Sequence, residues 1–156
     1  MDIEGLALEL EIGSKSYYGT DDHLYLGVVS RKGGREFALA ADAFNDFEAR
    51  NKANYFIGKR YHVDLPGRDL TPATNEIILE GGSLIDTEVS QVYLRKQSTP
   101  PSLNSQGGDD ALQITSARIW IFADDTPTQI YALRGPVNLM VEIGLTVWFD
   151  INSSAL

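Results

Sequence analysis

Hydrophobic and polar residues alternate with a period of two along most of this 156-residue chain. Between Leu6 and Ile12, every second residue is leucine or isoleucine, and the intervening residues are alanine or glutamate. Such alternation is typical of a β-strand that buries one face. The pattern predicts roughly eight or nine short strands. They lie at Leu6–Ile12, Leu24–Val29, Arg35–Ala40, Tyr61–Leu65, Glu76–Glu80, Val89–Arg95, Ala117–Phe122, Thr128–Leu133 and Leu145–Ile151.

Clusters of Gly, Pro, Asn and Asp separate these runs, and only residues 40–54 contain apolar positions with some helical spacing. We therefore predict an all-β fold, an antiparallel β-sandwich of about eight strands. The stretch QSTPPSLNSQGGDD at 97–110 has the composition of a flexible loop. Because the roughly 45 residues after it are too few for a second sandwich, we predict a single domain over residues 1–156.

The charge balance limits the classes of partner. The chain carries a formal net charge of −9 and contains no cysteine. A surface of this sign repels nucleic acid, and it repels anionic lipid unless cations intervene. The lack of cysteine excludes disulfides, thiolate zinc sites and a cysteine nucleophile. No stretch is long and apolar enough to span a bilayer. The acidic N-terminus differs from a secretory signal, so we expect a cytoplasmic protein, or a secreted one if a leader was removed.

A glycine, a threonine and two adjacent aspartates precede the second expected strand. One interpretation is structural, because Gly and Asp both favour turns. The other is a calcium site, because hard cations prefer carboxylate and carbonyl oxygens gathered from several loops. In the second interpretation Asp21 and Asp22 supply carboxylates, and more distant residues complete the site. The candidate ligands are Gly19, Thr20, Asp21, Asp22, Asn54 and Asp109.

Three stretches resemble the PLAT (lipoxygenase-homology) β-sandwich family, in the form seen in a bacterial branch of PLAT-like domains. They are YYGTDDHLYLGVV at 17–29, GGREFAL at 33–39 and NDFEARNKANYFIG at 45–58. The resemblance is specific over residues 6–58 and looser over 59–156. Two departures are Ala49-Arg50 in place of Arg-Gly, and Asn54 where an acid is frequent. The resemblance implies a membrane- or protein-docking module in which calcium neutralises an acidic rim.

Catalysis is not expected. The chain has two histidines, and His23 would lie on a strand opposite the apolar face, directed at solvent. No nucleophile-elbow, zinc-protease or phosphate-loop motif is present. A competing hypothesis is a carbohydrate-binding module that stacks sugars on exposed tyrosines. The candidate membrane or ligand contacts are Tyr17, Tyr18 and Tyr25, whereas core packing is expected for Phe37, Phe47, Phe56, Trp120 and Trp148.

The sequence thus predicts a non-catalytic binding module, calcium-assisted, that docks to a lipid surface or a protein partner. A carbohydrate-binding module and a purely structural domain without metal remain as alternatives. Calcium is the only expected cofactor, and neither nucleic acid nor a transmembrane segment is expected.

Overall fold

The fold is built from β-strands throughout the part of the chain that the structure, a computed structural model, describes. The described residues are 5–14, 23–30, 33–39, 52–58, 76–79, 89–97, 111–123, 126–133, 135–139 and 144–151. The strands are β1 (Gly5–Ile12), β2 (His23–Ser30), β3 (Gly33–Ala38), β4 (Lys52–Gly58), β5 (Glu76–Leu79), β6 (Val89–Gln97), β7 (Leu112–Ala123), β8 (Thr126–Ala132), β9 (Val137–Leu139), β10 (Thr146–Trp148) and β11 (Asp150–Ile151).

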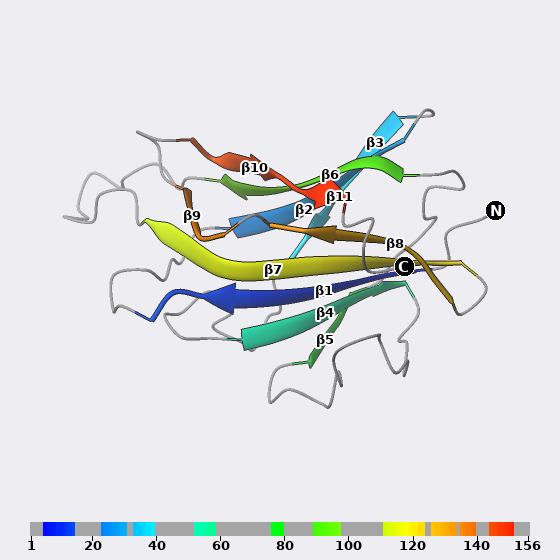
Figure 1. The fold of residues 1–156 in the computed structure, drawn as a ribbon, viewed down its shortest axis with the longest axis horizontal. Helices are drawn as coiled ribbons and strands as arrows, with labels where there is room; N and C mark the ends of the chain where they lie inside the picture. Colours follow the sequence, from blue (N-terminus) through cyan, green and yellow to red (C-terminus); the bar gives the residue numbers. More distant parts are fainter. Residues whose placement is uncertain are drawn as a thin grey trace.

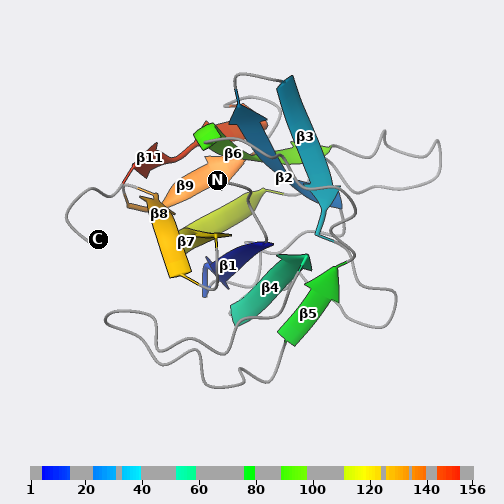
Figure 2. The ribbon, with the colours of Figure 1, turned by 90° about the vertical axis from the view of Figure 1, so that its right-hand side faces the viewer.

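The strands form two sheets that pack face to face (Figure 1). The seven-stranded sheet has the order β11-β8-β7-β1-β4-β5, with β9 also paired to β7, and the four-stranded sheet has the order β10-β6-β2-β3. Figure 2 shows the layers from one end, with β1, β4 and β5 in one and β2, β3 and β6 in the other. Among the described pairs only β4–β5 is parallel. The predicted antiparallel β-sandwich is therefore confirmed.

The main core lies between the sheets and follows the predicted alternation. Leu6, Leu8 and Leu10 of β1 are at most 2% exposed and belong to the same cluster as Leu24 and Leu26 of β2. Each such side chain contributes about 1.5–3 kcal/mol when it is fully removed from water. The period-two pattern thus assigned the inward faces of both sheets correctly.

The outer face of the seven-stranded sheet is also apolar over part of its area. Ala7 pairs in register with Phe56 of β4 and Trp120 of β7, and these three side chains are at most 3% exposed. Together with Phe122 and Ile130 they form a second cluster, the outer cluster. The centre of this sheet is therefore buried on both faces.

This double burial explains one strand that the sequence pattern missed. β4 lies between β1 and β5, and Asn54 to Ile57 are all buried, so its polar and apolar residues do not alternate. The expected helical turn at 40–54 is wrong for Lys52–Asn54, which begin β4, and residues 40–51 lie outside the described residues. The predicted loop 97–110 is wrong at its first residue, because Gln97 is the last residue of β6. Residues 98–110, Phe47 and the expected strand Tyr61–Leu65 lie outside the described residues.

The last expected strand, Leu145–Ile151, is two strands. β10 pairs with β6 in the four-stranded sheet, and β11 pairs with β8 in the seven-stranded sheet. Phe149 lies between them, is 7% exposed and is part of the main core. The chain therefore passes from one sheet to the other at Phe149.

Candidate functional site

The outer face of the four-stranded sheet carries a cluster of aromatic and charged side chains. The cluster, called the aromatic–charged patch below, consists of Tyr25, Glu36, Tyr93, Arg95 and Trp148. The register places its members in two neighbouring rows, with Tyr25 opposite Arg95, and Tyr93 between Gly27 and Trp148. The intervening residues of β2 and β6 belong to the main core. Because strand side chains alternate between faces, the patch points away from that core.

Glu36 on the edge strand β3 is the polar centre of the patch. Arg95 donates from Nε and Nη2 to its two carboxylate oxygens, at 2.7 Å each, and the Tyr93 hydroxyl donates to Oε1 at 2.9 Å. A bidentate guanidinium–carboxylate pair fixes the orientation of both side chains. These bonds leave Nη1 of Arg95 outside the ion pair.

The aromatic rings of the patch lie across the sheet because a small residue leaves room for them. A Cβ atom on Gly27 would be 2.0 Å from Cζ of Tyr93, so the ring rests directly on the β2 backbone. Arg95 also spans β2, with its guanidinium carbon 4.5 Å from the centre of the Tyr25 ring. The side chains of Tyr93 and Arg95, both on β6, thus cross β2 to reach Glu36 on β3.

Trp148 extends the patch onto the other edge of the sheet. Its ring centre is 4.7 Å from that of Tyr93, at an interplanar angle of 55°. It is 53% exposed, the one large hydrophobic residue found exposed among the described residues. The expected core position of Trp148 is therefore wrong, whereas Phe37, Phe56 and Trp120 are buried as expected. Trp148 faces outward because its neighbours Val147 and Phe149 face the core.

The pKa of the Glu36 carboxyl is lowered, mainly by the hydrogen bonds from Arg95. The pKa of the Tyr93 phenol is raised, first by burial and then by its bond to Glu36.

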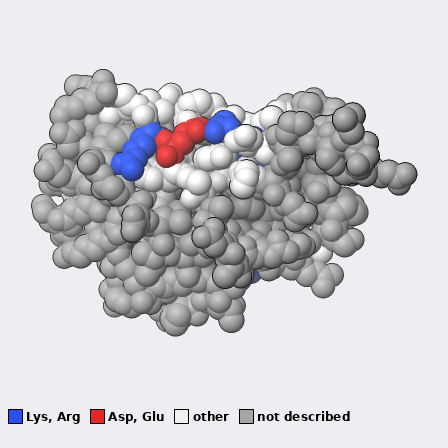
Figure 3. Space-filling model, turned by 180° about the vertical axis from the view of Figure 1, so that it is seen from behind, with Lys and Arg blue, Asp and Glu red and all other residues white. Residues whose placement is uncertain are grey.

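Figure 3 shows the molecule from behind. On the described part of this face, acidic side chains lie between basic ones, so this part carries charges of both signs.

Glu36→Gln should therefore change how stability depends on pH. The lowered pKa means that the carboxylate stabilises the fold above about pH 4.3, its unfolded value, and loses this effect as the pH falls through the folded value. The unfolding free energies of wild type and variant should converge as the pH falls below about 4.3 and through the lowered folded value. Because both partners are 32% exposed, the difference at pH 7 should stay below about 1 kcal/mol. Urea titrations across this range measure it, and a gap that stays constant with pH contradicts the assignment.

Of the residues singled out in the sequence, Tyr25 lies in the patch, partly buried beneath Arg95. His23 is exposed at the start of β2, as expected. The patch itself was not predicted, because Glu36, Tyr93 and Arg95 come together only through strand pairing. The remaining candidates Tyr17, Tyr18, Gly19, Thr20, Asp21, Asp22 and Asp109 lie outside the described residues.

The strands that border the acidic segments nevertheless show where those segments join the fold. Asp22 precedes His23, the first residue of β2, and Asp110 precedes Ala111 and the first residue of β7. Both strands begin, and β6 ends, at the end of the sandwich on the left of Figure 1. We call this end the loop end. The acidic pair Asp124–Asp125 comes between β7 and β8 in the sequence, and β7 ends and β8 begins at the opposite end of the sandwich.

Asn54, the remaining candidate ligand, lies within β4 rather than in a loop. Its register partner is Glu9, and it is 8% exposed on the outer face of the seven-stranded sheet. Among the described residues no group of three or more His, Cys, Asp or Glu side chains is placed to hold a metal ion. The calcium ligands therefore stay a prediction from the sequence.

A buried lysine lies at the loop end. Lys96 is 1% exposed and is opposite Leu24 in the register, and its backbone N–H donates to the Leu145 carbonyl at 2.8 Å. Lysine is rarely buried to this extent unless it is paired with an acid.

Comparisons with known proteins support the fold. No family model matches the sequence, and no curated protein matches it either. Among solved structures, the chain is similar to coral 8R-lipoxygenase, described as activated by calcium through a C2-like domain, with 17% identity, a TM-score of 0.55 and 94% of this chain covered. It is also similar to Clostridium perfringens α-toxin from an avian strain, with 14% identity, a TM-score of 0.57 and 96% of this chain covered.

A lipoxygenase deletion variant matches over 95% of this chain, with 15% identity and a TM-score of 0.56. The chain spans only 16% of that protein, 17% of the coral enzyme and 32% of the toxin. At such identities the likeness shows a shared PLAT-like or C2-like sandwich. Within the described part of the chain, no helix is long and apolar enough to cross a membrane.

Proposed function

We propose that this protein is a non-catalytic module that docks on a lipid surface through its loop end, with calcium as the bridging ion. The observation that carries the proposal is the position of the strand ends: β2 and β7, each entered from an acidic pair, begin at the same end of the sandwich. The similarity to a lipoxygenase described as activated by calcium through a C2-like domain also supports the proposal of a calcium-dependent module.

The donor chemistry of the loop segments suits calcium. Asp21, Asp22 and Asp109 would supply carboxylates, and Gly19 and Thr20 would supply backbone carbonyls. When bound, the ion would neutralise the acidic rim and allow it to approach phosphate groups. A chain with a net charge of −9 requires such neutralisation before it can approach anionic lipid.

The double variant Asp21→Asn/Asp22→Asn tests the proposal. We expect wild-type protein to sediment with phosphatidylserine-containing vesicles in millimolar calcium and to stay in solution with a chelator. Because the variant removes two carboxylates, its calcium affinity in calorimetry should fall by at least about tenfold, and sedimentation should fall with it. The matched control is Asp124→Asn/Asp125→Asn, which makes the same change in charge at the opposite end.

Three results would contradict this function. The first is a wild-type protein that shows neither calorimetric heat nor a rise in melting temperature with calcium, since binding to the folded state must stabilise it. The second is an equal loss of sedimentation in both double variants, which would indicate a general charge effect. The third is calcium binding without vesicle sedimentation, which would favour a protein partner.

A further inference from the structure

We propose that the aromatic–charged patch on the four-stranded sheet binds a neutral oligosaccharide. The patch is distinct from the loop end and uses different residues. Its components are a half-exposed tryptophan, a tyrosine held flat on the sheet, and a fixed arginine–glutamate pair. These are the two kinds of group that a sugar needs, an apolar platform and directional hydrogen-bonding partners.

Trp148 and Tyr93 form the platform. The electron-rich face of an aromatic ring attracts the positively polarised C–H groups of a sugar ring. Trp148 is 53% exposed and packs with Tyr93 at a centroid distance of 4.7 Å. Tyr93 in turn is held between the Gly27 backbone and its bond to Glu36, so a ligand would meet ordered rings. Preordered contacts cost less entropy on binding.

Arg95 and Glu36 supply the directional contacts. Each is 32% exposed, so both are accessible to a ligand while their mutual bonds of 2.7 Å hold them in place. The N–H groups of Nη1 in Arg95 lie outside that ion pair and can donate to sugar hydroxyls. Sites for small ligands usually combine an apolar surface with a small number of polar groups held at fixed positions.

The charge of the patch indicates which occupant it suits. Arg95 and Glu36 neutralise each other, and the chain as a whole is strongly acidic, which disfavours acidic sugars and anionic headgroups. Insertion into a membrane would also place this exposed ion pair in a medium of low dielectric, at a large cost. An uncharged polyhydroxylated ligand has neither penalty.

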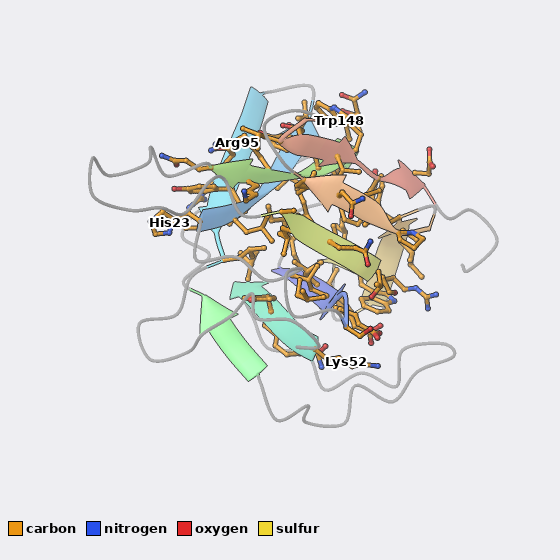
Figure 4. The ribbon with its side chains drawn as sticks, turned by 90° about the vertical axis from the view of Figure 1, so that its left-hand side faces the viewer. His23, Lys52, Arg95 and Trp148 are labelled. Atoms are coloured by element: carbon orange, nitrogen blue, oxygen red, sulfur yellow. The ribbon has the colours of Figure 1, made fainter. Side chains whose placement is uncertain are left out.

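The patch can be tested separately from the rest of the surface, because other exposed residues lie on the other sheet. Figure 4 shows Arg95 and Trp148 on the four-stranded sheet and Lys52 apart from them on the seven-stranded sheet. The Lys52 side chain is 68% exposed and pairs with Glu11 at 3.1 Å. Lys52→Ala therefore provides a matched surface control outside the patch.

The test is a printed array of neutral and acidic oligosaccharides, followed by calorimetry with the free form of each sugar that binds. We expect neutral oligosaccharides to bind, and Trp148→Ala to weaken their binding by roughly tenfold or more, because the platform is lost. Arg95→Lys should also weaken it, since an ammonium cannot reproduce the bidentate fork. Lys52→Ala should bind as wild type does.

Fluorescence provides a second readout. Trp148 is the exposed member of the two tryptophans and Trp120 is 1% exposed, so bound sugar should protect the emission from quenching by acrylamide. The proposal is overturned if no oligosaccharide binds to the array, or if Trp148→Ala binds sugars as well as wild type does. Loss of vesicle sedimentation in Trp148→Ala, without sugar binding by wild type, would also overturn it by showing a membrane contact. Asp21→Asn/Asp22→Asn should keep sugar binding, so the two proposals can fail independently.

Discussion

Trp120→Ala is expected to lower the free energy of unfolding by about 3–5 kcal/mol. Trp120 is 1% exposed in the outer cluster, where it packs with Ala7, Phe56 and other apolar residues. Its removal would forfeit the transfer free energy of a large aromatic side chain and leave a cavity that its neighbours fill only in part. Urea denaturation followed by circular dichroism measures the loss.

Trp148→Ala is the matched control, because the same chemical change is made at a site that is 53% exposed. We expect this variant to lose less than about 1.5 kcal/mol, mainly from its contact with Tyr93. Equal losses at the two tryptophans would contradict the placement of the outer cluster, and a larger loss at Trp148 would contradict its placement on an exposed edge strand.

Gly27→Ala is expected to destabilise the protein by about 1–3 kcal/mol, although alanine ordinarily suits a strand better than glycine does. The new Cβ would lie 2.0 Å from Cζ of Tyr93, so the ring must leave the β2 backbone. The Tyr93 bond to Glu36 and the packing on Trp148 would then be lost together. Denaturation measures the cost, and a fall in oligosaccharide binding measures the effect on the patch.

Gly34→Ala separates this clash from the general effect of a methyl group in the same sheet. A Cβ on Gly34 would meet its nearest atom, the Val28 carbonyl oxygen, at 3.4 Å, which is an ordinary contact. This variant should be unchanged or stabilised by up to about 1 kcal/mol, because alanine loses less backbone entropy on folding. A Gly27→Ala protein as stable as Gly34→Ala would show that Tyr93 does not need that space.

Much of the fold was predictable because the sandwich buries one face of most strands. The leucines of β1 and of β2 alternate with less apolar residues, and they occupy the core as their spacing indicates. The prediction failed where a strand is buried on both faces, as in β4, since Asn54 to Ile57 then form an unbroken buried run. It failed again at Leu145–Ile151, where one apolar stretch serves both sheets.

The candidate sites differ in how far local sequence could lead to them. Two adjacent aspartates after a glycine can be noticed in a single chain, and they led to the calcium hypothesis. The aromatic–charged patch gives no such signal, because Glu36 and Arg95 are 59 residues apart and meet only across paired strands. The expected core position of Trp148 is wrong because Val147 and Phe149 beside it are also apolar, so the local sequence does not show which of the three side chains faces outward.

Local alternation, turn residues and charge were enough to indicate an acidic β-sandwich, because these properties depend on neighbours along the chain. The order of strands, the face that each side chain occupies and the meeting of Tyr93, Arg95 and Glu36 required the folded protein. Register between distant strands sets those contacts, and a shift of one residue would turn every side chain of a strand to the opposite face.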